Sequence, residues 1–332
     1  MNRESHSLPP FALQPQLVPR IWGTRHLERW YPDATLTEAV GEAWLSGDAC
    51  VALSGPLRGQ SLREIFQSHG PAMLGTLPGT GDSPLLIKVI FAEEKLSVQV
   101  HPDDAMAQRK GTPRGKTECW YALEARPGAE VACGLKPGAT REAIEASLKD
   151  NSLEEWLDVL PVAAGEMIFV EAGTVHAIWP GAVLLETQQN SDVTYRLYDY
   201  GRPRPLHLAE SLEAMRFTNN SGKRRPVALA DRELLVDCAY FRIERMTIRG
   251  ATAGGQLDHG EPRLNYLFRT SGSSSGTNSG TVRVIGRDGD EIPWPANTVL
   301  AVPAQRQEFT LHCETQAELV RIVAGKTAGS RA

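Results

Sequence analysis

The sequence has few of the features that mark secreted, membrane-bound or nucleic-acid-binding proteins. Its five cysteines in 332 residues follow no regular spacing, so they do not form a disulfide framework. No apolar run reaches the roughly 20 residues that a membrane-spanning helix needs, and the N-terminus has no apolar core of signal-peptide length. We therefore expect a cytoplasmic protein that does not contact a membrane.

Basic charge is also scarce. Lys and Arg number 35 against 40 Asp and Glu, which gives a net charge of −5. The densest basic cluster, Lys223–Arg225, lies in a polar stretch of Asn, Ser and Gly and is interpreted as a solvated linker. This distribution argues against nucleic acid as a partner. An anionic substrate would have to be bound by local cations.

The sequence does contain a succession of short apolar runs separated by Gly, Pro, Asn and Asp, which is typical of antiparallel β structure. These runs predict strands in residues 84–93, 96–100, 118–123, 167–170, 182–186 and 193–198. From Asp231 onward a second β-rich unit is expected, with strands in residues 240–248, 263–269, 281–286 and 298–304. The low-complexity stretch 270–280 is predicted to be a flexible hairpin loop.

Three segments show helical spacing instead. Ser61 opens a capping-box-like start for a short helix. Thr140 begins a longer pattern that runs to Leu160 and is predicted to break at Asn151 into two helices, inserted between strands. A further short helix is expected over residues 206–215.

The two β-rich units share a local pattern. Residues 297–308 repeat the layout of residues 165–176: a turn, a five-residue strand, and a polar side chain at the same offset. In the second copy Glu308 stands where the first has His176, so we expect two related barrels of which only the first binds a metal. The predicted organisation is a catalytic metal-binding domain (1–138 and 161–225), a helical insertion (139–160), a C-terminal β domain (226–325) and a disordered tail (326–332).

Candidate metal ligands lie in the first unit. Gln99 and His101 alternate along one predicted strand, and because side chains at i and i+2 project to the same side, they can face one point. His176 follows the glycine turn in the segment 165–176, and Glu118 adds a carboxylate. Two imidazoles and a carboxylate suit zinc or another divalent ion, with Gln99 as a weaker fourth ligand. A single histidine in a β-barrel is more often a hydrogen-bonded packing residue, so each motif alone is weak.

A polar run from Glu186 to Arg196 follows the last of these ligands. Its composition fits either an exposed edge strand or the wall of a site, and its position favours the wall. Arg196 and Arg202 can bind phosphate in a forked geometry. Lys88 stands in an otherwise apolar strand, where an unpaired ammonium would be costly. It is therefore expected either to reach solvent or to line a cavity.

Together these motifs resemble mannose-6-phosphate isomerase of type I, the zinc-dependent, short bacterial form in the cupin superfamily. The resemblance is carried by residues 96–105 (LSVQVHPDDA), 115–121 (GKTECWY) and 181–202 (GAVLLETQQNSDVTYRLYDYGR). It implies a mainly β fold of two tandem jelly-roll barrels with a small inserted helical segment. It also implies an aldose–ketose isomerase that interconverts mannose 6-phosphate and fructose 6-phosphate through a cis-enediol.

Carried over residue by residue, the resemblance assigns the metal role to His101, Glu118, His176 and Gln99, with one Zn²⁺ or other divalent ion per chain. Arg196 corresponds to the family's catalytic arginine. Glu186 is a candidate for the catalytic base, with Lys116 and a metal-bound water as competitors. The residues expected to contact the phosphate or the sugar hydroxyls are Ser97, Lys88, Lys116 and Arg202.

Two other classes of protein are weighed against the isomerase. A cupin dioxygenase would also use His and Glu ligands, but it needs iron and usually a His-x-His pair, and here Gln99 occupies the first position of that pair. A non-catalytic sugar-binding cupin is disfavoured by the intact ligand set. The sequence therefore favours the isomerase and leaves the oligomeric state open.

Overall fold

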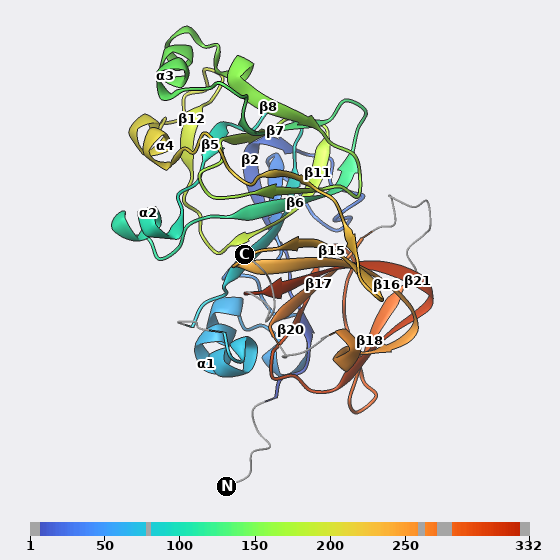
Figure 1. Cartoon of the computed structure of the whole chain (residues 1–332). Coiled ribbons are helices and arrows are strands. Elements are labelled where there is room, and N and C mark those ends of the chain that lie inside the picture. The colour runs from blue at the N-terminus through green and yellow to red at the C-terminus, as the bar shows by residue number, and fades with distance from the viewer. Residues whose placement is uncertain (1–6, 78–80, 258–262, 271–280, 326–332) are drawn as a thin grey trace.

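Three antiparallel sheets form the framework of the computed structural model, which describes residues 7–77, 81–257, 263–270 and 281–325 (Figure 1). The predicted loop at 271–280 and the predicted tail at 326–332 lie outside the described residues. Within the described part, no helix is long and apolar enough to cross a membrane. The mainly β fold expected from the sequence is confirmed.

A seven-stranded and a five-stranded sheet form the first barrel. In spatial order, the seven-stranded sheet contains β13 (Gly222–Arg224), β9 (Met167–Val170), β6 (Glu118–Ala125), β11 (Ala182–Gln189), β4 (Leu85–Phe91), β3 (Val40–Trp44) and β2 (Gln16–Thr24). The five-stranded sheet contains β12 (Tyr195–Tyr198), β5 (Val98–Val100), β10 (His176–Ile178), β7 (Glu130–Leu135) and β8 (Leu157–Pro161). Side chains from both sheets, such as Trp120 and Val131, fill one apolar cluster between them.

The third sheet, here called the C-terminal sheet, packs on the opposite face of the seven-stranded sheet. It contains β1 (Phe11–Ala12), β20 (Val299–Val302), β17 (Asn265–Arg269), β21 (Phe309–Ala324), β16 (Phe241–Ala253), β15 (Arg232–Asp237), β14 (Val227–Ala228), β18 (Val282–Gly286) and β19 (Glu291–Ile292). Because both faces of the seven-stranded sheet are covered, every residue of β4 is buried. Burial on both faces explains why this strand reads as a nearly continuous apolar run.

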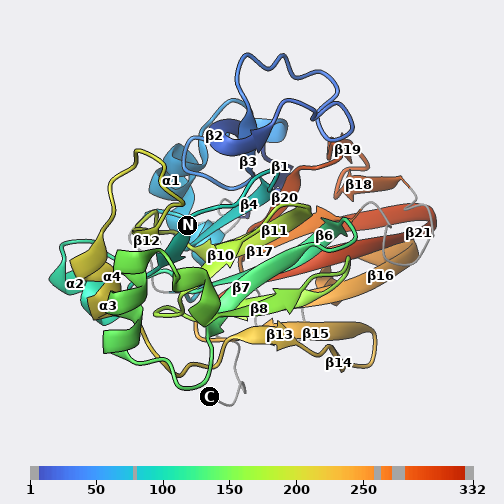
Figure 2. The ribbon, with the colours of Figure 1, turned by 90° about the horizontal axis from the view of Figure 1, so that it is seen from above.

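The helices cover the edges of this arrangement. They are α1 (Leu62–Leu74), α2 (Asp104–Arg109), α3 (Arg141–Asp150) and α4 (Leu208–Ala214). The last three lie together beside the five-stranded sheet (Figure 2), and each contributes to the apolar cluster on its outer face. The capping box predicted at Ser61 is present, with Glu64 as its partner. The predicted helix at 206–215 is also confirmed as α4.

The second helix predicted between Asn151 and Leu160 is wrong. The chain leaves α3 at Asn151 in a left-handed conformation (φ 63°) and makes a single 3-10 turn over Leu153–Trp156. It then forms β8, which pairs antiparallel with β7. The apolar spacing of this segment fits either a short helix or a strand. It forms a strand because its backbone can hydrogen-bond to the otherwise open edge of β7.

The interpretation of Lys223–Arg225 as a solvated linker is also wrong. Gly222–Arg224 forms β13, which pairs with β9. Lys223 makes an ion pair with Glu166 at 2.8 Å, and the guanidinium of Arg224 stacks 4.8 Å from the ring centre of Phe169. The local composition does not predict this strand, because the strand is stabilised by pairing with β9, which is more than 50 residues away in the sequence.

The local repeat between the two barrels keeps its layout in the structure. Gly165 and Asn297 both adopt positive φ (86° and 57°), and each precedes a four-residue strand, β9 or β20. The first strand, β1, pairs with β20, so the N-terminal residues contribute to the C-terminal sheet. The domain limits given above stay a prediction.

Candidate metal centre and substrate cavity

The two sheets of the first barrel bring the predicted metal ligands to one place. His176 begins β10 and pairs with Gln99 of β5, while His101 follows β5 directly. Glu118 begins β6 in the facing sheet. One ligand atom from each of His101, Glu118 and His176 lies within 4.8 Å of the others, and all three side chains are buried.

Backbone carbonyls fix how the two imidazoles are oriented. Nδ1 of His101 lies 2.8 Å from the carbonyl oxygen of Val193, and Nδ1 of His176 lies 2.9 Å from that of Thr174. A carbonyl oxygen can only accept, so each Nδ1 carries the proton and each Nε2 keeps its lone pair. Both Nε2 atoms face Glu118, at 3.5 and 3.4 Å from its carboxylate oxygens. This is the arrangement in which an outer hydrogen bond orients a metal-binding histidine.

The protonation states also suit a cation. Burial lowers the pKa of both His101 and His176, which keeps the imidazoles neutral. Burial alone would raise the pKa of Glu118, but the neighbouring Lys116 ammonium holds it below its ordinary value. Neutral imidazoles and an ionised carboxylate are the forms that bind metal.

Glu118 has a buried carboxylate oxygen available for such an ion. Its Oε1 is buried and accepts no hydrogen bond from the described part of the chain, while Oε2 lies 2.8 Å from Nζ of Lys116. Nζ of Lys116 is also 3.1 Å from Nε2 of His101. The side-chain amide nitrogen of Gln99 lies 3.2 Å from Nε2 of His176, and rotating this amide by 180° would present its oxygen. The donor set therefore fits one divalent cation.

A cavity of about 460 Å³ opens beside this cluster. Of the predicted site residues, those that line it are Lys88, Ser97, Gln99, Lys116, Glu186 and Arg196. Other residues that line it, for which the sequence predicts no role, include Arg20, Trp22, Glu42, Asp192, Thr194 and Arg204. Five of the residues that line the cavity are Lys or Arg and three are acidic, so cations are in excess and can bind an anionic substrate.

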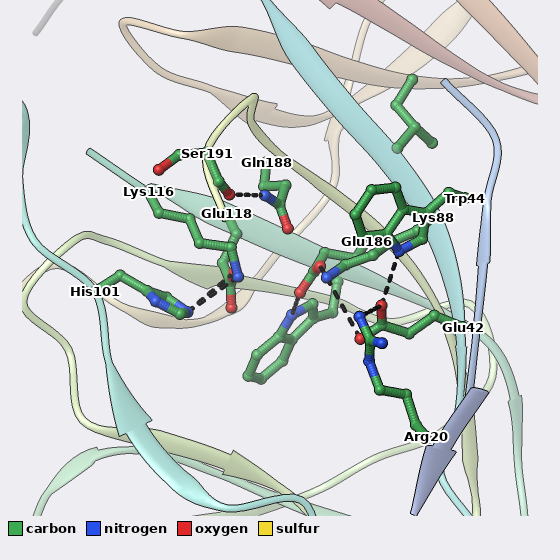
Figure 3. Close-up of polar contacts among 12 residues, drawn as sticks. Arg20, Glu42, Trp44, Lys88, His101, Lys116, Glu118, Glu186, Gln188 and Ser191 are labelled. Atoms are coloured by element: carbon green, nitrogen blue, oxygen red, sulfur yellow. Dashed lines mark hydrogen bonds and ion pairs between the residues drawn. The ribbon is translucent and has the colours of Figure 1, made fainter. Parts of the chain in front are cut away.

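One wall of the cavity is a row of alternating charges across neighbouring strands of the seven-stranded sheet (Figure 3). Arg20 on β2 pairs with Glu42 on β3 at 2.9 Å. Lys88 on β4 lies between Glu42, at 3.8 Å, and Glu186 on β11, at 2.6 Å. Trp120 on β6 closes the row by donating its indole N–H to Glu186 at 2.9 Å. Lys88 thus lines the cavity rather than reaching solvent.

The first part of the polar run, Glu186 to Gln189, forms the end of β11 and is not an exposed edge strand. β11 pairs with β4 on one side and β6 on the other, so it lies inside the sheet. Glu186, Gln188 and Gln189 are all buried. The run therefore forms a wall of the site, the alternative that its position in the sequence favoured.

The three arginines near the end of this run differ in their surroundings. Arg196 on β12 lines the cavity, and its Nε is buried without a hydrogen-bond partner among the described residues. Arg202 does not line the cavity and pairs instead with Asp199 and Glu94, both at 3.4 Å. Arg204, which has no assigned role in the sequence reasoning, lines the cavity and is held by two bonds to Asp199, at 2.6 and 2.5 Å.

The sequence carries a weak signal for the missed residues. Glu42 and Trp44 alternate on a strand that is otherwise apolar, and in the structure the indole N–H of Trp44 donates to Glu42 at 2.8 Å. An acidic residue in a buried strand needs a partner. The sequence does not indicate that Arg20 and Lys88 supply it, because that depends on the order of the strands.

A jelly-roll barrel that encloses a His–Glu–His cluster beside a cationic cavity defines a metal-dependent enzyme of the cupin fold. Comparison with known proteins narrows this class. A model of the family described as phosphomannose isomerase type I, catalytic domain, matches residues 11–137. A mannose-6-phosphate isomerase of Streptococcus mutans is 33% identical over 259 residues, which cover 73% of this chain and 80% of that protein.

Two further similarities extend over almost the whole chain. A Bacillus subtilis protein described as a probable mannose-6-phosphate isomerase is 31% identical over 323 residues, covering 92% of this chain and 97% of its own. The crystal structure of mannose 6-phosphate isomerase from Bacillus subtilis has a TM-score of 0.81 and 27% identity, covering 95% of this chain and 99% of that one. The chain belongs to the mannose-6-phosphate isomerase family, a family of aldose–ketose isomerases. The resemblance drawn from the sequence is confirmed, and the dioxygenase and the non-catalytic sugar-binding protein are not supported.

Proposed function

We propose that this protein interconverts D-mannose 6-phosphate and D-fructose 6-phosphate by moving a proton between C1 and C2 through a cis-enediol. Family membership supports the reaction class. The observation that carries the proposal is the cationic cavity directly beside the buried cluster of His101, Glu118 and His176. Such a cavity suits a phosphorylated sugar whose reacting carbons lie near the cluster.

We further propose that one Zn²⁺ per chain binds to His101, Glu118 and His176, with Gln99 as a fourth ligand. A divalent ion bound there would polarise the carbonyl and hydroxyl oxygens at C1 and C2 and stabilise negative charge on them. Lys116 supports this set by holding Glu118 ionised, at 2.8 Å from its Oε2.

The chain's own cations are proposed to hold the rest of the substrate. Arg196 lines the cavity, and its buried Nε has no hydrogen-bond partner among the described residues. It is proposed to bind the substrate or to stabilise the negative charge that develops on it. Ser97 and Lys88 line the cavity and can contact the phosphate or the hydroxyls. We assign the role expected of Arg202 to Arg204 instead, because Arg204 lines the cavity and Arg202 does not.

Glu186 is proposed as the base that moves the proton. Its carboxylate lies on the cavity wall, where Lys88 and the indole of Trp120 fix its orientation. A carboxylate on this wall can take the proton from one of the two carbons and deliver it to the other, while a second proton moves between the oxygens at C1 and C2. Lys116 also lines the cavity and is the competing candidate, but as the ammonium that keeps Glu118 ionised it has no lone pair to take the proton.

A coupled assay for fructose 6-phosphate formation, run on metal-loaded protein with and without a chelator, tests the proposal. Activity on mannose 6-phosphate that the chelator removes and Zn²⁺ restores is the expected result. No turnover of mannose 6-phosphate by the metal-loaded protein would refute the function. We also propose a cytoplasmic location, which is supported by five cysteines that form no disulfide.

A further inference from the structure

A chain of hydrogen bonds links the C-terminal sheet to residues 115–118 of the first barrel, the segment that carries Lys116 and Glu118. Tyr240, in the turn between β15 and β16, donates its hydroxyl proton to Oδ2 of Asp104 at 2.8 Å. Oδ1 of Asp104 accepts the backbone N–H of Gly115 at 2.8 Å and Nε2 of Gln189 at 2.9 Å. Oε1 of Gln189 accepts the backbone N–H of Thr117 at 2.9 Å.

These bonds fix the backbone on both sides of Lys116. The N–H of Lys116 itself donates to the carbonyl of Pro102 at 3.0 Å. Gly115 lies so close to the backbone of residues 102–104 that a Cβ there would come within 2.5 Å of it. The segment therefore cannot move without breaking several contacts. Its position sets that of the Lys116 ammonium, which reaches both Glu118 and His101.

We propose that Tyr240 is a positioning residue for the isomerase: through Asp104 it holds the segment 115–118, so that Lys116 and Glu118 keep their places at the metal centre. This inference rests on the proposed function. It gives the C-terminal sheet a part in the reaction, although that sheet contributes no residue to the His–Glu–His cluster.

The setting of this contact determines how strong the effect should be. Tyr240, Asp104 and Gln189 line a second cavity, of about 490 Å³, between the C-terminal sheet and the first barrel. Because this cavity is open, water can replace part of a lost hydrogen bond. Removing an outer partner of a metal ligand typically costs 10- to 100-fold in metal affinity or activity. Because Tyr240 acts through Asp104 and lies one step further from the metal ligands, we expect its loss to lower activity and metal affinity about fivefold.

The test variant is Tyr240→Phe, which removes only the hydroxyl group. In the metal-loaded protein, kcat should fall about fivefold while KM for mannose 6-phosphate stays within twofold, because Lys88 and Arg196 are on other strands. Transfer of the metal to a chromogenic chelator should speed up by a similar factor. Asp104→Asn should act in the same direction, and the double variant should be no worse than Asp104→Asn alone.

Tyr31→Phe is the matched control. The Tyr31 hydroxyl donates to the carbonyl of Asn297 at 3.1 Å, so it also joins the first part of the chain to the C-terminal sheet, away from the segment 115–118. Its kcat and its rate of metal release should stay within twofold of wild type. The proposal is overturned if Tyr240→Phe behaves like this control, or if the effects of Tyr240→Phe and Asp104→Asn multiply. If the wild-type protein does not turn over mannose 6-phosphate, the function fails, and metal release still tests the positioning.

Discussion

Replacing Glu42 by Gln should destabilise the protein strongly and in a pH-dependent way. Glu42 is only 6% exposed and lies in the charge row of the cavity wall, beside Arg20 and Lys88. Burial works to raise its pKa, but Lys88, Arg20 and the indole of Trp44 more than offset this and lower the value to about 2. Glutamine keeps the shape of the side chain and removes its charge.

The size of the effect follows from the pKa. A carboxyl group whose pKa falls from its ordinary value of 4.5 to about 2 on folding stabilises the folded state by ~3 kcal/mol at pH 7, at ~1.4 kcal/mol per pH unit. The sign is that of a lowered pKa: the stabilisation is complete above pH 4.5 and is lost as the pH falls toward 2. At pH 3.5 about 2 kcal/mol should remain.

Urea unfolding of the wild type and Glu42→Gln, followed by tryptophan fluorescence between pH 3.5 and pH 7, measures this difference. The exposed Glu38, just before β3, gives a matched control, since Glu38→Gln removes the same charge and should change the free energy of unfolding by less than about 0.5 kcal/mol. The prediction fails if the free energies of unfolding of the wild type and Glu42→Gln differ by less than about 1 kcal/mol at pH 7, or if their difference does not shrink toward pH 3.5. Either result would show that Arg20 and Lys88 do not lower the pKa of Glu42 on folding.

Further predictions concern the reaction and the metal. Glu186→Gln should slow deuterium exchange at C2 of the sugar phosphate by at least about 100-fold, and exchange at the wild-type rate would exclude Glu186 as the base. Chelation should abolish activity and lower the unfolding temperature, because Glu118 is then left buried with an unsatisfied oxygen, and an unchanged temperature would argue against a bound ion. Arg196→Lys should raise KM about tenfold, because Lys lacks the forked donors of Arg, as steady-state kinetics can check. Trp120→Phe should cost about 1–3 kcal/mol in urea unfolding by removing the hydrogen bond to Glu186, and a loss within 0.5 kcal/mol would contradict that bond.

Much of the candidate metal site could be predicted from the sequence because most of its residues belong to local patterns. Gln99 and His101 share a strand face by simple alternation, and His176 follows a glycine turn at fixed spacing. The capping box at Ser61 was equally local, and it is present. Where the pattern suited two structures, as in 152–160, the prediction of a helix failed.

The rest of the cavity depends on strand order. Arg20, Glu42, Lys88 and Glu186 are far apart in the chain, and no local spacing relates them. They meet because β2, β3, β4 and β11 are neighbours in one sheet, with Lys88 directly opposite Glu186 in the register.

The sequence by itself determined the fold class, the family and the residues that can bind a metal, because those depend on short patterns of side-chain type and spacing. Only the tertiary structure decided which charges neutralise one another around the cavity. It also revealed that Tyr240, in the turn between β15 and β16 of the C-terminal sheet, reaches Asp104 beside the segment 115–118. Such contacts join residues that are distant in the chain, and their distances are set by how the sheets pack rather than by any local preference of the backbone.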